Sequence, residues 1–314
     1  DLNQNPIINN ARLQFNYGNT INAIMENRDS VIISHSANTY AGNFTTNANS
    51  YLWFNGQNSS SVIIFNNDVT NNGLIEFTSN GCNYTQFNMA SGKTLTNANI
   101  GIVKSNLPGA GCYGYHRMDG RFINNGLLSL FYPLYNNGNS FINSAAATIN
   151  GNSMLLLENT NLHNAGTISP GGTTAGLSID ATIKNTNTAI WNIQIGGLTA
   201  ITQHDQIINN YSTRTDSING TLNISLINGF VPGLGDSVII ETHNNRVGSF
   251  STINGASIPG GLVWNIFYRP NSIVLRAGNP PNLNIAATSG ANGNISPSGV
   301  VSVVYNATQV FNFN

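Results

Sequence analysis

NNGLIEF, residues 71–77, is the stretch that decides the fold: an asparagine–glycine turn followed by a short apolar run. Asparagine and glycine tolerate positive φ angles that strain other residues, so the pairing predicts a turn that leads into a β-strand. The unit recurs as NNGLLSL at 124–130, NAGTIS at 164–169 and NGTLNISL at 219–226. A repeated turn-and-strand unit indicates a scaffold.

Similar short apolar runs, separated by Asn, Gly and Ser, continue to about residue 172. They have the length of strands and are too short to indicate helices. Gly126 and Gly166 are 40 residues apart, which fits two coils of about 20 residues, whereas the 53 residues from Gly73 to Gly126 require longer loops. We therefore predict an all-β, right-handed parallel β-helix, in which asparagines form ladders at turns and apolar residues form columns inside. The alternative is an antiparallel β-sandwich, which predicts hairpins about 8–12 residues apart and less self-similarity.

The composition excludes several partners. Only 7% of the 314 residues are charged, the net charge is −1, and 56 residues are asparagine. Nucleic acid and anionic membranes both require clustered basic side chains, which 11 Lys and Arg do not supply. No run of about 20 apolar residues occurs, so we expect no transmembrane segment. Scarce charge and abundant amides are typical of an exported protein, and residues 1–3 have the appearance of a mature terminus after removal of a signal peptide.

From residue 168 the sequence changes character. The segments are TISPGGTTAGLSI (167–179), TAIWNIQIGG (188–197), TQHDQIIN (202–209), a long segment with GTLNISL and GFVPGLGD (218–241), and VGSFSTING (247–255). In this order they resemble the end of the passenger region of bacterial surface β-helix proteins, namely autotransporter-like adhesins and cell-surface proteins of the Bacteroidota. The resemblance covers about 165–275 and implies a C-terminal cap, in which we expect residues 221–228 and 236–241 to fold across the open end of the stack.

These patterns divide the chain into four parts. Residues 1–167 are coils with loop insertions, 168–277 are the last coils and the cap, and 278–282 are a linker stiffened by two adjacent prolines. Residues 283–314 resemble the first half of a bacterial immunoglobulin-like or β-grasp-like repeat, with strands at 283–288, 300–304 and 308–313. About 30 residues cannot bury a core alone, so we expect the natural protein to continue.

The segment 113–121 contains the densest group of aromatic and charged side chains with possible chemical roles. The first interpretation is a solvated loop whose aromatic and charged side chains cover the coils. If the segment binds a ligand, we expect a carbohydrate contact, because stacked tyrosines suit sugar faces. The alternative is a β-helix lyase in which His116 is a general base and Arg117 or Arg121 binds a uronate. The candidate residues are Tyr113, Tyr115, His116, Arg117, Asp119 and Arg121.

The remaining candidates are modifications and metals. Cys82 and Cys112 occupy similar turn-like surroundings and are candidates for a disulfide. Ser30, Ser217 and Ser237 each follow Asp and precede Val or Ile, which resembles a short O-glycosylation signal of some Bacteroidota. The five histidines are dispersed, so we expect no metal site and no cofactor; Ca²⁺ at a single turn is not indicated by any motif.

These observations predict a structural or adhesive module of a larger bacterial protein. The resemblance implies display outside or on the surface of a Gram-negative cell, export by a type IX secretion system and contact with its outer-membrane components. The expected partners are glycans or cell-surface molecules, and the neutral surface also allows self-association. The alternative is a polysaccharide lyase or glycoside hydrolase, although glycosidases require two suitably spaced carboxylates and acids are few here. A lesser alternative is an ice-binding β-helix, but threonine pairs such as Thr94 with Thr96 do not recur at coil spacing.

Overall fold

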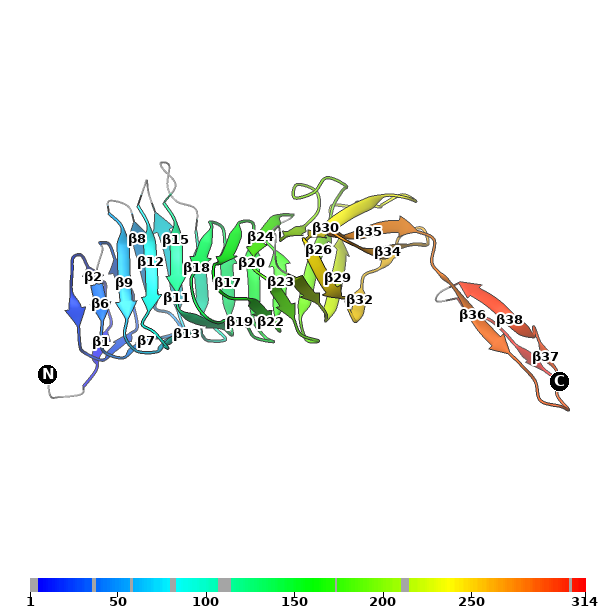
Figure 1. Cartoon of the computed structure of the whole chain (residues 1–314), viewed down its shortest axis with the longest axis horizontal. Coiled ribbons are helices and arrows are strands. Elements are labelled where there is room, and N and C mark those ends of the chain that lie inside the picture. The colour runs from blue at the N-terminus through cyan, green and yellow to red at the C-terminus, as the bar shows by residue number, and fades with distance from the viewer. Residues whose placement is uncertain are drawn as a thin grey trace.

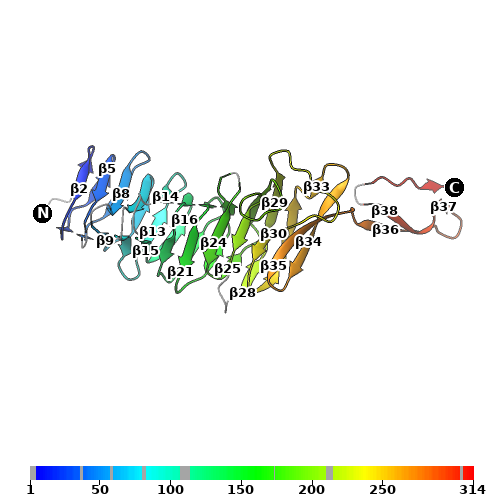
Figure 2. The ribbon, with the colours of Figure 1, turned by 90° about the horizontal axis from the view of Figure 1, so that it is seen from above.

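The protein is a right-handed parallel β-helix, which confirms the predicted fold class (Figure 1). The computed structural model describes residues 5–35, 38–56, 59–79, 83–106, 114–172, 174–209, 215–304 and 307–314. Coils stack along a rod, and each coil gives one strand to each of three sheets, which we name A, B and C (Figure 2). The described residues contain no helix.

Sheet A consists of β1 (Ile7–Asn9), β4 (Met25–Asn27), β7 (Phe44–Thr46), β10 (Val69–Asn71), β13 (Thr94–Asn97), β16 (Arg121–Asn124), β19 (Phe141–Asn143), β22 (Leu162–Asn164), β25 (Ile183–Asn185), β28 (Thr215–Ile218) and β31 (Asn245–Gly248). Sheet B consists of β2 (Leu13–Phe15), β5 (Ser30–Ile33), β8 (Tyr51–Gly56), β11 (Leu74–Ser79), β14 (Ile102–Ser105), β17 (Leu127–Leu130), β20 (Thr148–Gly151), β23 (Thr167–Pro170), β26 (Ile190–Ile195), β29 (Thr221–Leu226) and β32 (Thr252–Asn254). Sheet C consists of β3 (Thr20–Ile21), β6 (Asn38–Tyr40), β9 (Ser61–Phe65), β12 (Thr85–Met89), β15 (His116–Asp119), β18 (Leu134–Asn136), β21 (Met154–Leu157), β24 (Gly176–Asp180), β27 (Gln206–Ile208) and β30 (Ser237–Thr242), followed by β35 (Ser272–Gly278), β34 (Leu262–Arg269) and β33 (Ser257–Ile258). The remaining strands are β36 (Asn282–Ala287), β37 (Ile295–Ser296), β38 (Gly299–Val304) and β39 (Asn312–Phe313).

The coil lengths explain the irregular glycine spacing. Asn71 pairs with Asn97, and Asn97 with Asn124, through coils of 26 and 27 residues. Asn124 pairs with Asn143, and Asn143 with Asn164, through coils of 19 and 21 residues. The prediction of two short coils after residue 126 and longer loops before it is therefore confirmed.

Apolar columns fill the interior of the rod. Their residues alternate with outward residues along each strand, so that each inward side chain lies above its counterpart in the preceding coil. Burying a large apolar side chain stabilises the fold by about 1.5–3 kcal/mol, so the columns supply most of the stability. One sheet B column contains Leu13, Val31, Leu52, Ile75, Val103, Leu128, Ile149, Ile168, Trp191, Leu222 and Ile253.

Asparagines form a directional ladder at the turn from sheet A to sheet B. Every member except the last donates an Nδ2 hydrogen bond to the Oδ1 atom of the next asparagine, over 2.8–2.9 Å. The ladder ends at Asn185, whose Nδ2 atom has no hydrogen-bond partner, because Ile218 occupies the next position in register. This inner ladder confirms the predicted role of asparagine as a corner residue, and it consists of Asn71, Asn97, Asn124, Asn143, Asn164 and Asn185.

The reason for the corner glycines differs from the predicted one. Gly73, Gly126 and Gly166 do not adopt positive φ; in the four recurring units only Gly220 does, at 82°. A Cβ atom on Gly126 would instead lie 2.3 Å from the carbonyl oxygens of both Ala98 and Gly101. Glycine is required at these corners because a neighbouring coil approaches closely, not because the backbone is left-handed.

The cap is also built differently from the prediction. Residues 221–226 and 237–242 are regular strands of sheets B and C, because their apolar side chains continue the inward columns. The strands that extend beyond the last coil are β35, β34 and β33, which continue sheet C in antiparallel order. Trp264 of β34 is 3% exposed and packs against the end of the core.

The last residues form two small antiparallel pairs, β36 with β38 and β37 with β39. Val300 and Phe313 are 73% and 77% exposed, so few apolar side chains are covered there. The limited burial agrees with the expectation that this segment cannot bury a core by itself.

Candidate functional site

The outer face of sheet C brings aromatic and charged side chains of the predicted segment together with others from neighbouring coils. Tyr84 and Tyr115 precede β12 and β15, and Tyr135 lies in β18. The rings of Tyr84 and Tyr115 stack with centroids 5.1 Å apart, and Tyr135 meets Tyr115 edge to face at 6.1 Å. Parallel register produces this stack, since Thr85 pairs with His116 and Arg117 pairs with Tyr135.

Arg117 is the centre of a charged network on the same face. Its Nε atom donates to Asp119 at 2.7 Å, while its two terminal nitrogens donate to both oxygens of Glu158 at 3.1 and 2.6 Å. The hydrogen bonds to Glu158, and then those to Asp119, raise the pKa of the guanidinium above its usual value. Two-point binding fixes the guanidinium plane. We name the three tyrosines with this network the sheet C patch: Tyr84, Tyr115, Tyr135, Arg117, Asp119 and Glu158.

Asp119 also connects the patch to a corner hollow of about 240 Å³. Lys93, Asp119 and Arg121 line this hollow, and Arg121 is exposed. Asp119 accepts a further hydrogen bond from the backbone of Asn137 at 2.8 Å. The hollow therefore offers two cationic side chains beside the patch, which suits an acidic or hydroxyl-rich ligand.

His116 does not belong to the surface site. Its side chain is 0% exposed and points into the core, between Ser105 Oγ at 2.7 Å and Ser79 Oγ at 3.3 Å. Burial lowers the pKa of His116 to about 3, so the ring is neutral at ordinary pH. The predicted roles as a ligand contact or a surface general base are wrong for this residue, because alternation along β15 turns Arg117 and Asp119 outward and His116 inward.

We expect His116 to remain neutral across about pH 5–8, the range in which an ordinary histidine titrates. In the unfolded chain His116 takes up its proton near the usual pKa of 6.5, whereas in the folded protein it does so only near 3. The free energy of unfolding therefore keeps the full contribution of the neutral ring above about pH 6.5 and loses it as the pH falls towards 3. Imidazole NMR shifts measure the titration, and a His116→Gln variant identifies the resonances of this ring. Titration of His116 within this range in the folded protein would contradict its inward placement.

Cys82, Cys112 and Tyr113 lie outside the described residues, so the predicted disulfide and the role of Tyr113 stay predictions. Ser30 and Ser217 are partly exposed and Ser237 is exposed. Modification of these three hydroxyls also stays a prediction.

Asp205 has a structural role. Its two carboxylate oxygens accept backbone hydrogen bonds from Ala175 at 2.8 Å and Gln194 at 2.9 Å. Within the described ranges, no three His, Cys, Asp or Glu side chains come together in a group that could hold a metal ion. No helix in the described part of the chain is long and apolar enough to cross a membrane.

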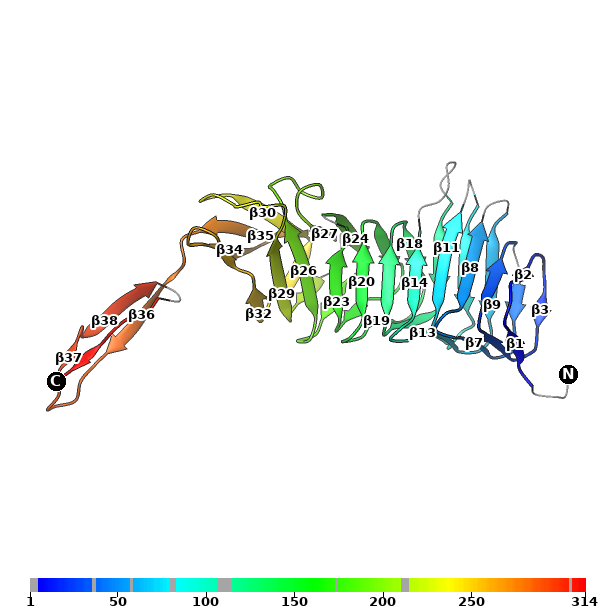
Figure 3. The ribbon, with the colours of Figure 1, turned by 180° about the vertical axis from the view of Figure 1, so that it is seen from behind.

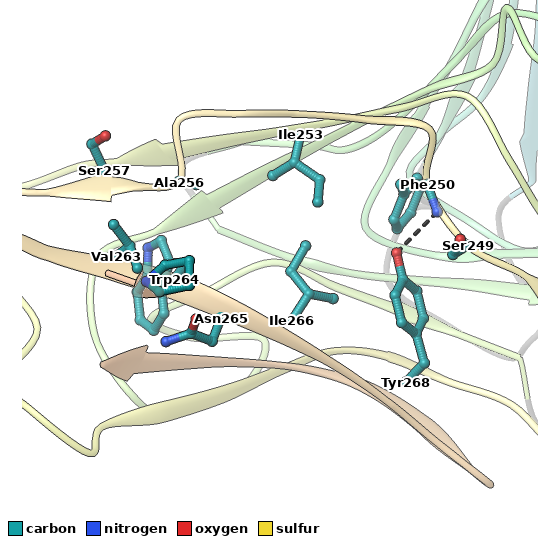
Figure 4. Close-up of a pocket in the computed structure, with 11 residues that line it drawn as sticks. Ser249, Phe250, Ile253, Ala256, Ser257, Val263, Trp264, Asn265, Ile266 and Tyr268 are labelled. Atoms are coloured by element: carbon teal, nitrogen blue, oxygen red, sulfur yellow. Dashed lines mark hydrogen bonds between the residues drawn. The ribbon is translucent and has the colours of Figure 1, made fainter. Parts of the chain in front are cut away.

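A larger apolar cavity, about 410 Å³, lies at the C-terminal end of the rod (Figure 4). Ile253 and Ile266 point toward each other across it, and the Phe250 backbone N–H donates to the Tyr268 hydroxyl at 2.9 Å. The sequence did not predict this cavity. Its walls come from the last coil and from the antiparallel strand β34, and no local sequence motif indicates that these two segments pack together.

No model of a known protein family matches the chain, and a search of curated proteins finds none with significant similarity. The function is therefore argued from the fold and from the side chains that it brings together.

Proposed function

We propose that the protein is an extracellular structural module, a rigid stalk that binds glycans through the sheet C patch. The observation that carries the proposal is the patch itself: three tyrosines and a fixed Arg117–Asp119–Glu158 network come together from neighbouring coils on one face of the rod. Tyrosine supplies apolar ring surface together with a hydroxyl, and the ion network supplies oriented polar groups, which are the two kinds of contact that sugars use.

The rod explains how weak contacts become useful. Stacked coils with continuous sheets and an internal amide ladder hold the patch in one orientation, so a ligand does not have to order the site. Several copies on one surface would add their contacts as avidity. Display at the surface of a Gram-negative cell, export by a type IX system and continuation into further domains belong to this proposal, and they rest on the sequence resemblance.

The alternative is a polysaccharide-degrading enzyme that uses Asp119 and Glu158. A glycosidase needs one carboxyl to donate a proton and a second to act on the sugar or on water. Here both carboxylates bind the same guanidinium, and the one nearby histidine is buried in the core. This arrangement favours binding over bond cleavage.

The proposal predicts that Tyr115→Ala weakens glycan binding at least about tenfold, or ~1.4 kcal/mol, because it removes the central ring of the stack. Arg117→Ala should have a similar effect through loss of the ion network. Binding of the intact protein to arrayed polysaccharides, followed by titration with the best oligosaccharide, measures both effects. Assays for reducing ends and unsaturated uronates run on the same samples.

Matched controls lie elsewhere on the rod. Tyr17→Ala removes an exposed tyrosine whose ring contacts that of His35 at a tilted angle, and Arg28→Ala removes an exposed arginine paired with Glu26. Both controls should bind as the parent does. Substrate cleavage by the parent that is lost in Arg117→Ala would replace the proposal with the enzyme, and equal losses in the control and patch variants would remove the patch from the site.

A further inference from the structure

The outer face of sheet B carries a second regular feature, in the C-terminal half of the rod. From β20 to β32 each strand presents one outward residue near its start and another two positions later, separated by an inward apolar residue. The outward residues align in two columns, which we name the sheet B array. The array consists of Thr148 and Asn150, Thr167 and Ser169, Ile190 and Asn192, Thr221 and Asn223, and Thr252 and Asn254.

The two columns form a lattice of small polar groups. Neighbouring strands lie about 4.8 Å apart, and alternate residues of one strand lie about 6.6 Å apart, so hydroxyls and amides recur at fixed intervals in two directions. The strands β20, β23, β26 and β29 lie side by side along the rod (Figure 3). Ile190 interrupts the threonine column, but it preserves the β-branched shape.

Hydrogen bonds hold part of the array in place before any ligand arrives. Asn254 donates to Asn223 at 2.8 Å, and Asn223 donates to Asn192 at 2.9 Å. At the other end, Ser129 donates to Asn150 at 2.7 Å. Side-chain ladders of this kind also favour a flat sheet, and fixed rotamers lower the entropy lost on binding.

The chemistry of the array selects its partner. It contains no charged and no aromatic residue, so it lacks the groups that bind anions, cations or stacked sugar rings. The array is a neutral surface of hydroxyl, amide and methyl groups that recur at regular intervals along and across the strands. Such a surface matches a partner that itself repeats in two directions and forms hydrogen bonds without charge.

From this geometry we propose that the sheet B array binds ice. Water molecules bridging the hydroxyl and amide groups would be ordered by the fixed side chains, and they would join the surface layer of a growing crystal. The sequence test for paired threonines within one strand misses this face, because the repeated unit is T-x-N or T-x-S and coils of different length separate its copies. The array lies on a different sheet from the glycan-binding patch, so neither proposal depends on the other.

Ice growth in a dilute solution of the intact protein tests the proposal. The expected result is thermal hysteresis, faceted crystals and incorporation of fluorescently labelled protein into the ice. Thr167→Tyr places a bulky ring within the array and should abolish all three effects. Ser178→Tyr, in the same coil but on the outer face of sheet C, is the matched control and should retain them.

Circular dichroism spectra test whether each variant is folded. If Thr167→Tyr does not fold, Thr221→Tyr takes its place as the array variant. Absence of ice binding by the parent overturns the proposal, and so does retention of binding by the folded array variants. Equal loss in Ser178→Tyr also overturns it, because the effect would then not be specific to this face. If the array variants changed only binding to an insoluble polysaccharide, or only association between copies, the partner would be that solid or a second chain instead of ice.

Discussion

Gly126→Ala should lower the free energy of unfolding by about 3 kcal/mol or more, at the upper end of the range for overpacking. The added methyl group would lie 2.3 Å from the carbonyl oxygens of Ala98 and Gly101. Both contacts are with backbone, which cannot rotate away as a side chain can, and the corner is held by the inner ladder. The coil must therefore move away from its neighbour, and the hydrogen bonds between the coils are strained.

Urea unfolding followed by circular dichroism measures the effect as a shift in the midpoint and in the extrapolated stability. Gly233→Ala is the control, since its added methyl group would meet only one atom, Asp236 Oδ2, at 3.6 Å. The control should change stability by no more than about 0.5 kcal/mol. Comparable stability of Gly126→Ala and the parent would contradict the close approach of the coils.

Asn124→Ala should cost about 3 kcal/mol, the second large effect. Asn124 accepts a hydrogen bond from Asn97 at 2.8 Å and donates to Asn143 at 2.9 Å and to the Thr148 carbonyl at 3.1 Å. Its removal leaves buried polar groups without their partners and opens a cavity at a corner that is 0% exposed. The loss should exceed that of a single exposed hydrogen bond.

The ladder contains its own control for this experiment. Asn185 accepts from Asn164 at 2.8 Å, but its Nδ2 atom donates to nothing. Asn185→Ala removes fewer hydrogen bonds and should therefore cost clearly less than Asn124→Ala in the same urea titration. Equal losses would mean that the amide chain does not stabilise the rod in the way that its geometry indicates.

Local sequence was informative wherever the fold repeats. The NNGLIEF unit at 71–77 predicted a strand at the right place, and its recurrence predicted parallel stacking, because parallel coils place identical side chains above one another. The physical reason for its glycine was nevertheless mistaken. Close approach between coils is a contact between residues about 25 positions apart, and only the assembled stack shows it.

The candidate site was predictable only in part. The segment 113–121 was found from its composition, and the alternation of HRMD at 116–119 already contained the signal that His116 shares the inward face with Met118. Glu158 and Tyr84 could not be assigned, because they reach Arg117 and Tyr115 from coils whose register depends on loop lengths. The same dependence hid the sheet B array, whose members are spread over more than 100 residues.

The sequence by itself determined that this protein is a stack of short strands turned by asparagine and glycine, with few charged residues and a net charge of −1. These properties follow from local preference and composition, which act within a few residues. Only the tertiary structure decided which outward side chains become neighbours, that His116 is buried in the core, and that β35, β34 and β33 cover the C-terminal end of the rod. Those outcomes depend on coil register and on packing between residues far apart in the chain, where the favourable energy comes from burial that no short segment achieves alone.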